Sequence, residues 1–243
     1  MKITAIISVF ACAAVASAVD VVAPNAFAAT EGPGTFSLTT NTAGGRVYQM
    51  VIDSSQLTGL VGTNLDGMSF RLNSGATWPP VQVDMSQFDI WVGEGVDPTA
   101  ITTTVDSNFI GTATQVRSGA ISFFPGDFPT GGTPNGFGPN FGFNLGSYAY
   151  NGGDLAVLIR FATQTPIGGT AGQAAFDAIA ATDTANGYGS LFAAKWQSGS
   201  TSTTVNSNGN FIVTKFSGTP VPEPMTLGLL GLGGLAALRR RKK

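Results

Sequence analysis

The sequence predicts an all-β protein, an antiparallel β-sandwich of the jelly-roll kind, with an N-terminal signal peptide and a single C-terminal membrane helix. Short runs rich in β-branched and aromatic residues recur between clusters of Gly, Asn, Asp and Pro, as strands and their turns do. The chain holds 33 glycines, a turn density that excludes a helical bundle. Apolar runs stand at both ends, and five consecutive cations follow the second run.

Seven of the short runs are expected to form strands. They are 46–52, 68–72, 88–92, 120–124, 155–161, 191–196 and 210–216. In the last run, alternation places Ile212, Thr214 and Phe216 on one face of the strand. One helix is expected over 171–181, where alanines and an isoleucine are spaced for a single helical face. No repeat of 20 to 50 residues is visible, which argues against a solenoid or a propeller.

The N-terminus predicts a signal peptide over residues 1–18. Lys2 precedes an apolar run, and Ala16-Ser17-Ala18 is the small-residue pattern that signal peptidase accepts, so cleavage is expected after Ala18. A lipidated Cys12 is the alternative, which the bulky Phe10 disfavours. Cleavage after Ala18 removes the only cysteine, and the mature protein then has no disulfide, thiol nucleophile or cysteine metal site.

The C-terminus predicts a membrane anchor that holds the body outside the cytoplasmic membrane. Met225 to Leu238 are 14 residues of apolar, glycine- and leucine-rich chain. A helix of this length spans about 21 Å, which is less than the roughly 30 Å thickness of the hydrocarbon core. Cations whose side chains extend to the membrane surface, together with local thinning of the bilayer, reduce this mismatch in length. The stop-transfer residues follow, namely Arg239, Arg240, Arg241, Lys242 and Lys243. Because clustered cations stay cytoplasmic, both ends of the chain predict the same topology.

The order Pro222-Glu223-Pro224, apolar helix and basic tail resembles the PEP-CTERM sorting signal of bacterial exported proteins. The resemblance covers residues 221–243. It implies that Pro222, Glu223 and Pro224 are the recognition motif and that an exosortase-like membrane enzyme is a processing partner. It also implies delivery to the cell surface or extracellular matrix. Runs such as Phe70-Arg71-Leu72 and Trp78-Pro79-Pro80 are similar to the uncharacterised β-rich body domain of certain PEP-CTERM proteins, for which no activity follows.

Between the two signals, the sequence predicts one body domain over 19–216 and a short linker over 217–220. Residues 19–220 hold six basic and thirteen acidic residues, a net charge of −7. An acidic domain with scattered single cations has no patch that collects phosphates, so nucleic-acid binding is excluded.

The residue types available limit the chemistry. Histidine is absent, which excludes a Ser-His-Asp triad and histidine metal ligation. A carboxylate pair of the kind used by glycosidases remains, with candidates Asp84, Asp89, Glu94 and Asp97. The set Asp84, Asp89, Asp97 and Asp106, or Asn151 with Asp154, has the oxygen ligands that calcium requires, but the spacing is not that of an EF-hand and such Asx residues are expected to form turns. We therefore expect no enzymatic activity, no cofactor and no catalytic residue.

Aromatic residues leave one alternative function open. Phe128, Phe137, Phe141 and Phe143 lie in a long loop, where they either present rings to a sugar or anchor the loop to the sheet, the reading that the loop length favours. Trp78 and Trp91 pose the same choice. The first expectation is a non-enzymatic structural or adhesive protein. The alternative is a carbohydrate-binding module for envelope polysaccharide, and exposure of the rings distinguishes them.

Overall fold

The computed structural model describes residues 17–39 and 43–221, and in these ranges the protein is all-β with antiparallel sheets. This confirms the predicted class. The described ranges contain no α-helix and no helical segment with the length and apolarity required to cross a bilayer. Residues up to Ala16 of the predicted signal peptide, the motif Pro222 to Pro224, the predicted membrane helix and the basic tail lie outside the described residues.

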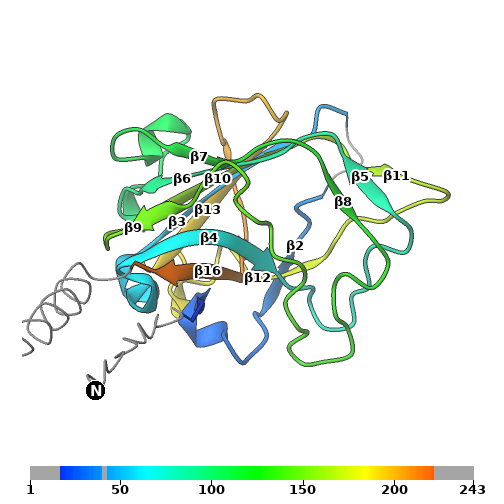
Figure 1. Cartoon of the computed structure of the whole chain (residues 1–243), viewed down its shortest axis with the longest axis horizontal. Helices are drawn as coiled ribbons and strands as arrows, with labels where there is room; N and C mark the ends of the chain where they lie inside the picture. Colours follow the sequence, from blue (N-terminus) through cyan, green and yellow to red (C-terminus); the bar gives the residue numbers. More distant parts are fainter. Residues whose placement is uncertain (1–16, 40–42, 222–243) are drawn as a thin grey trace, which may run out of the picture.

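Six strands form the largest sheet (Figure 1). In spatial order they are β14 (Ser207–Asn208), β13 (Phe192–Ser198), β3 (Arg46–Ile52), β10 (Leu155–Phe161), β6 (Phe88–Glu94) and β7 (Thr114–Arg117). Nearly all side chains of β3 and β10 are buried on both faces and most of them are apolar, as expected for central strands covered from two sides.

A four-stranded sheet faces the first one and is completed by two smaller sheets. Its strands are β1 (Val19–Ala23), β16 (Thr214–Pro220), β4 (Thr63–Phe70) and β9 (Tyr148–Tyr150). The smaller sheets are β11 (Thr165–Pro166), β5 (Val83–Met85) and β8 (Ile121–Phe123), and β15 (Phe211–Ile212), β12 (Phe176–Ile179) and β2 (Gly34–Phe36). Short 3-10 turns connect them: Asn25–Phe27, Ser54–Gln56, Thr58–Leu60, Pro98–Ala100, Asp106–Asn108 and Thr184–Asn186.

The main hydrophobic core lies between these sheets. Met50 and Val157 enter it from the six-stranded sheet, and Met68 and Phe216 enter it from the four-stranded sheet. A second, smaller apolar cluster lies on the opposite face of the six-stranded sheet. That sheet is therefore buried on part of both faces, and the loops that cover its outer face determine what remains accessible.

The predicted strands over 46–52 and 155–161 coincide with β3 and β10. The predicted helix over 171–181 is wrong, because this segment contains strand β12. All four residues of β12 are buried between β15 and β2. Pairing and burial on both sides outweigh the weak local preference of alanine for helix.

The run 210–216 is not one strand, because the chain changes sheets at Val213. Phe211 and Ile212 pair with β12, whereas Thr214 onward pairs with β1 and β4. Side chains on both faces of the run are buried at this crossing, those of Phe211 and Val213 as well as those of Ile212, Thr214 and Phe216. Residues 217–220, expected to form a linker, are the last four residues of β16.

A buried ion pair fastens the N-terminal segment to this region. The Nε of Arg71 lies 2.7 Å from the Asp177 carboxylate, and both side chains are at most 1% exposed. The remaining guanidinium nitrogens donate to carbonyls of the N-terminal segment, those of Phe27, Ala28 and Thr30. Burial raises the pKa of Asp177, and its hydrogen bond with Arg71 opposes that rise.

Replacing Asp177 with Asn removes the counter-charge of a guanidinium that has no access to water. We expect the free energy of unfolding to fall by about 3–5 kcal/mol in urea titrations. Lys215→Met is the matched control, because Lys215 pairs with the half-exposed Asp20 at 3.1 Å. Loss of that pair is expected to cost less than about 1 kcal/mol. Equal losses in both variants would contradict the assigned role of the buried pair.

Candidate functional site

The loop aromatics anchor the loop to the body. Phe128 and Phe141 are 2% exposed, and Phe137 and Phe143 pack partly buried against the core. The loop backbone also bonds strand β4, since Phe141 N–H donates to the Met68 carbonyl at 2.7 Å. The anchoring interpretation holds for these rings.

Trp78 is likewise a core residue. It is 4% exposed, and its indole N–H donates to the Gly172 carbonyl at 2.9 Å. Its ring packs against Phe123, Phe128 and Phe176 at centroid distances of 5.2 to 6.4 Å. Trp78 is therefore not available to a ligand.

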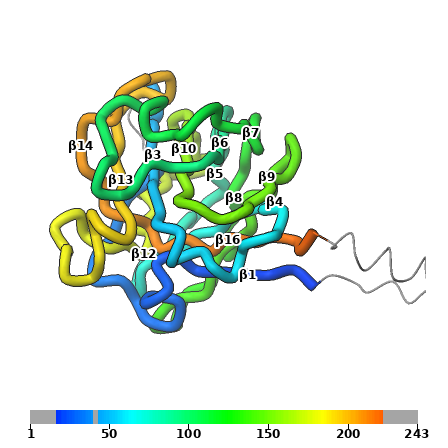
Figure 2. The backbone as a smooth tube through the Cα atoms, turned by 90° about the vertical axis from the view of Figure 1, so that its left-hand side faces the viewer, coloured from blue at the N-terminus to red at the C-terminus, as the bar shows by residue number. Residues whose placement is uncertain are grey.

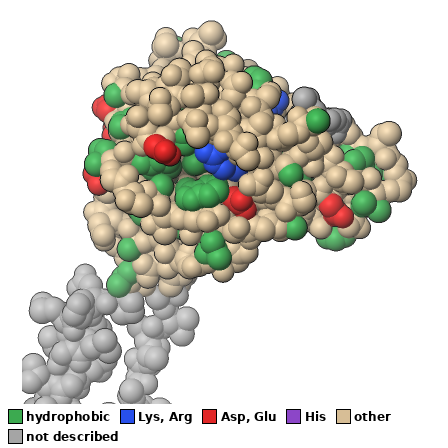
Figure 3. Space-filling view, turned by 90° about the horizontal axis from the view of Figure 1, so that it is seen from above, with side chains coloured by type: hydrophobic (Ala, Val, Ile, Leu, Met, Phe, Trp, Pro, Cys, Tyr) green, Lys and Arg blue, Asp and Glu red, His purple; other side chains and the backbone are tan. Residues whose placement is uncertain are grey.

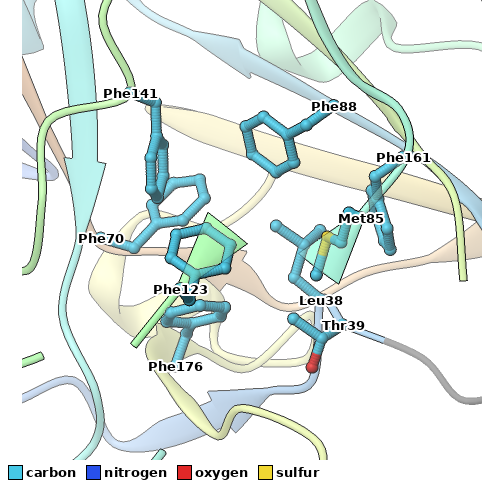
Figure 4. A pocket seen from close by; sticks show the side chains of 9 residues that line it. All are labelled: Leu38, Thr39, Phe70, Met85, Phe88, Phe123, Phe141, Phe161 and Phe176. Carbon is cyan, nitrogen blue, oxygen red and sulfur yellow. The ribbon is translucent and has the colours of Figure 1, made fainter. Parts of the chain in front are cut away.

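The phenylalanines next to this group enclose a cavity inside the core (Figure 4). Its volume is about 10 Å³. The lining residues are Leu38, Thr39, Phe70, Met85, Phe88, Phe123, Phe141, Phe161 and Phe176. A space of this size holds at most one water molecule, and its lining offers that water almost no polar partner. The cavity is a packing defect of an aromatic core and has no room for a ligand.

Several of the acidic residues singled out in the sequence accept hydrogen bonds from separate local partners. Asp97 caps a 3-10 turn by accepting from the Thr99 N–H at 2.8 Å, and Asp84 accepts from the Gln82 amide at 2.9 Å. These hydrogen bonds lower the pKa of both carboxyls. Asp154 accepts from the Ser54 N–H at 2.8 Å, and burial raises its pKa. Among the residues that the structure describes, no three acidic side chains converge as a metal site.

Trp91 differs from the other aromatic residues of the candidate set because it points out of the sheet. Along β6, Phe88, Ile90 and Val92 enter the main core, so Asp89, Trp91 and Gly93 face outward. Trp91 is partly exposed. It lies in a surface hollow of about 350 Å³, which we call the Trp91 hollow. The hollow is lined by Trp91, Asp106, Phe109, Gly111, Thr112 and Ala113.

One wall of the Trp91 hollow is a loop that a buried amide network holds to the sheet. Gln49, on the outer face of β3, donates to the Val105 carbonyl at 3.0 Å and accepts from Asn108 at 2.8 Å. Gln49 and Asn108 are fully buried. Ile110 N–H also donates to the Glu94 carbonyl at 2.8 Å. The wall is therefore fixed in place without a disulfide.

A cation lies beside the Trp91 ring. The guanidinium carbon of Arg160 is 5.9 Å from the ring centroid, within cation–π range. Arg160 also donates to the carbonyls of Ser200 and Ser202 at 2.7 Å each. Burial lowers the pKa of Arg160, and the nearby carboxylates of Asp106 and Asp89 oppose that change. Figure 3 shows this face, where apolar side chains in a hollow lie beside basic and acidic ones.

Two local features shape the Trp91 hollow. The pairing of β6 with β7 shifts register between Ile90 and Trp91, because β7 carries the extra residue Val116 between Gln115 and Arg117, and such a bulge bends the strand that holds it. At Gly93 an added Cβ would lie 2.9 Å from the Phe109 ring. Glycine at this position lets Phe109 lie close to the sheet.

The sequence named Trp91 as an aromatic to be judged by exposure, but it counted Arg160 only as a scattered cation. The available signal was the alternation in the run 155–161, which places Arg160 on the same face as Ala156 and Leu158. Its position opposite Asp89 is known only from the structure. Pairing of β10 with β6 is a long-range contact, and no local pattern specifies it.

The two described ends of the chain lie side by side at one sheet edge (Figure 2). Val19 is opposite Gly218 in the antiparallel pair of β1 and β16. Ser17 and Ala18, at the predicted signal cleavage site, are exposed just before β1. At the other end, Val221 N–H donates to the Gly62 carbonyl at 3.0 Å. The sorting segment therefore begins directly at the folded body.

Comparison with known proteins gives one match. Residues 220–242 match the PEP-CTERM protein-sorting motif. No curated protein and no solved structure matches the chain. The motif supports an exported, envelope-associated protein that is processed by an exosortase-like enzyme.

Replacing Gly93 with Val tests how the Trp91 hollow is built. The new side chain must displace Phe109, and we expect a loss of about 1–3 kcal/mol in unfolding free energy, measured by thermal or urea unfolding. Gly142→Ala is the control, because an added Cβ there meets nothing within 4 Å. Its expected effect is within about 0.5 kcal/mol. A neutral Gly93→Val would mean that Phe109 does not pack as described.

Proposed function

We propose that this chain is an exported protein of the bacterial cell surface or extracellular matrix, with a structural or adhesive and non-enzymatic role. The PEP-CTERM match at residues 220–242 is the observation that carries the proposal. The proposed body is a jelly-roll-like sandwich, which the facing six-stranded and four-stranded sheets support.

The position of the chain ends supports the proposed route. Because β1 and β16 are neighbours, a signal peptide before Val19 and a membrane helix after Val221 start from the same edge of the body. Both can then engage one membrane without unfolding the domain. In the proposed topology the helix Met225 to Leu238 anchors the chain, transiently or lastingly, and the cations from Arg239 to Lys243 remain cytoplasmic.

Binding of envelope polysaccharide is the second candidate function. The Trp91 hollow favours it, because Trp91 is partly exposed and lies beside polar and charged side chains. A carboxylate-based glycosidase has less support. A general acid needs a raised pKa, whereas the pKa values of Asp84 and Asp97 are lowered.

The sorting proposal is tested by the intact mass of the protein from fractionated native cells. We expect a wild-type species that begins at Val19 and ends near Pro222 to Pro224. A Glu223→Ala variant is expected to retain Lys243, because the recognition motif is altered.

Glu94→Ala is the control for the sorting test, since Glu94 is an exposed acid of the body and its variant should be processed like the wild type. Retention of Lys243 in the wild type would instead identify an ordinary C-terminal anchor.

A further inference from the structure

We propose that the Trp91 hollow binds one unit of a neutral polysaccharide chain, with the sugar ring stacked on the indole of Trp91. This inference rests on the carbohydrate-binding function proposed above and names its site and ligand class. It does not depend on the sorting signal, so each proposal can fail alone.

The dimensions of the Trp91 hollow fit a single sugar ring. Its volume of about 350 Å³ is at the lower end of the range for small-molecule sites. The site is an open hollow on the surface and not an enclosed cavity, so a ligand longer than one ring can extend into solvent. Ligand sites of this kind combine an apolar contact face with a few placed polar groups.

Trp91 supplies the apolar contact. The negative face of an aromatic ring attracts the weakly positive C–H groups that cover one side of a pyranose. Phe109 and Ala113 extend the apolar floor. The bulge beside Trp91 and the absence of a side chain at Gly93 place these groups around one space.

Polar groups stand where the sugar hydroxyls would lie. Asp106 lines the Trp91 hollow with a carboxylate that accepts hydrogen bonds, and Thr112 adds a hydroxyl that donates or accepts. The guanidinium of Arg160 lies over the indole 5.9 Å from its centroid and does not line the hollow, so the sugar would stack on the part of the ring that faces the hollow. Acceptors and donors around an aromatic face suit vicinal hydroxyl groups, each of which both donates and accepts.

Charge selects a neutral chain over an acidic one. Asp106 lies in the site, and Asp89 is directly opposite Arg160 across the β6–β10 ladder. Arg160 already donates to two backbone carbonyls, so much of its hydrogen-bonding capacity is used within the protein. The body also carries a net charge of −7, which repels a polyanion. A uronate polymer carries a carboxylate on every sugar unit, and each of these carboxylates would be repelled by the negative charge of the body.

Titration calorimetry of the full chain in detergent tests the proposal. The probes are neutral hexasaccharides of gluco, manno and galacto configuration, and a galacturonate hexamer of equal length. We expect at least one neutral probe to bind more tightly than the hexamer. Trp91→Ala is expected to weaken that binding by about 30-fold or more, the loss typical of a central aromatic contact. Trp91→Phe should recover part of it.

Two matched variants distinguish the site from the rest of the surface. Phe124 is an aromatic residue 48% exposed outside the Trp91 hollow, and Asp84 is a carboxylate on β5. Phe124→Ala and Asp84→Asn should leave binding unchanged, whereas Asp106→Asn should weaken it several-fold. Unchanged unfolding curves for Asp106→Asn and Trp91→Phe exclude misfolding as the cause.

Three outcomes would overturn the proposal. They are absence of binding to every neutral probe, stronger binding of the galacturonate hexamer, and equal affinity of the wild type and Trp91→Ala.

Discussion

The buried ion pair between Arg71 and Asp177 is the constraint on which the rest of the body depends. A sequence with a single cysteine can form no disulfide within the chain, and the N-terminal segment around Phe27 to Thr30 has few ladder bonds of its own. Arg71 replaces such a link by bonding three carbonyls of that segment as well as Asp177. The other arginines of the body act similarly, since each donates to at least one backbone carbonyl: Arg46, Arg117 and Arg160. Because these arginines bond backbone carbonyls within the protein, they neutralise little of the acidic surface.

From Asp177 the constraint extends to both ends of the chain. The Asp177 carbonyl accepts from Val213 N–H at 2.9 Å, at the point where the chain leaves one sheet for another. That crossing starts β16, and β16 in turn holds β1. The ion pair, the sheet change and the adjacent ends thus form one connected arrangement. It lets an exported body fold completely while its two terminal segments leave from a single edge.

The sequence predicted what depends on local patterns and missed what depends on long-range contacts. Runs 46–52 and 155–161 match their strands because β-branched and aromatic residues fill them and turn residues bound them. The alanine-rich run 171–181 was misread because burial between two strands decides its structure. The Trp91 hollow could not be predicted from the sequence, since strand pairing and a loop held to the sheet bring its lining residues together. Whether Trp91 is exposed could be learned only from the structure.

The central claim is that the folded body is displayed on the outside of the cell. The body has only two lysines, Lys195 and Lys215, and Lys195 is partly exposed on β13. A membrane-impermeant amine reagent applied to intact native cells, followed by peptide mass mapping, therefore reports where the body is. The account predicts labelling of Lys195 on intact cells, to the same extent as after the envelope is broken. Labelling only after the envelope is broken would contradict it.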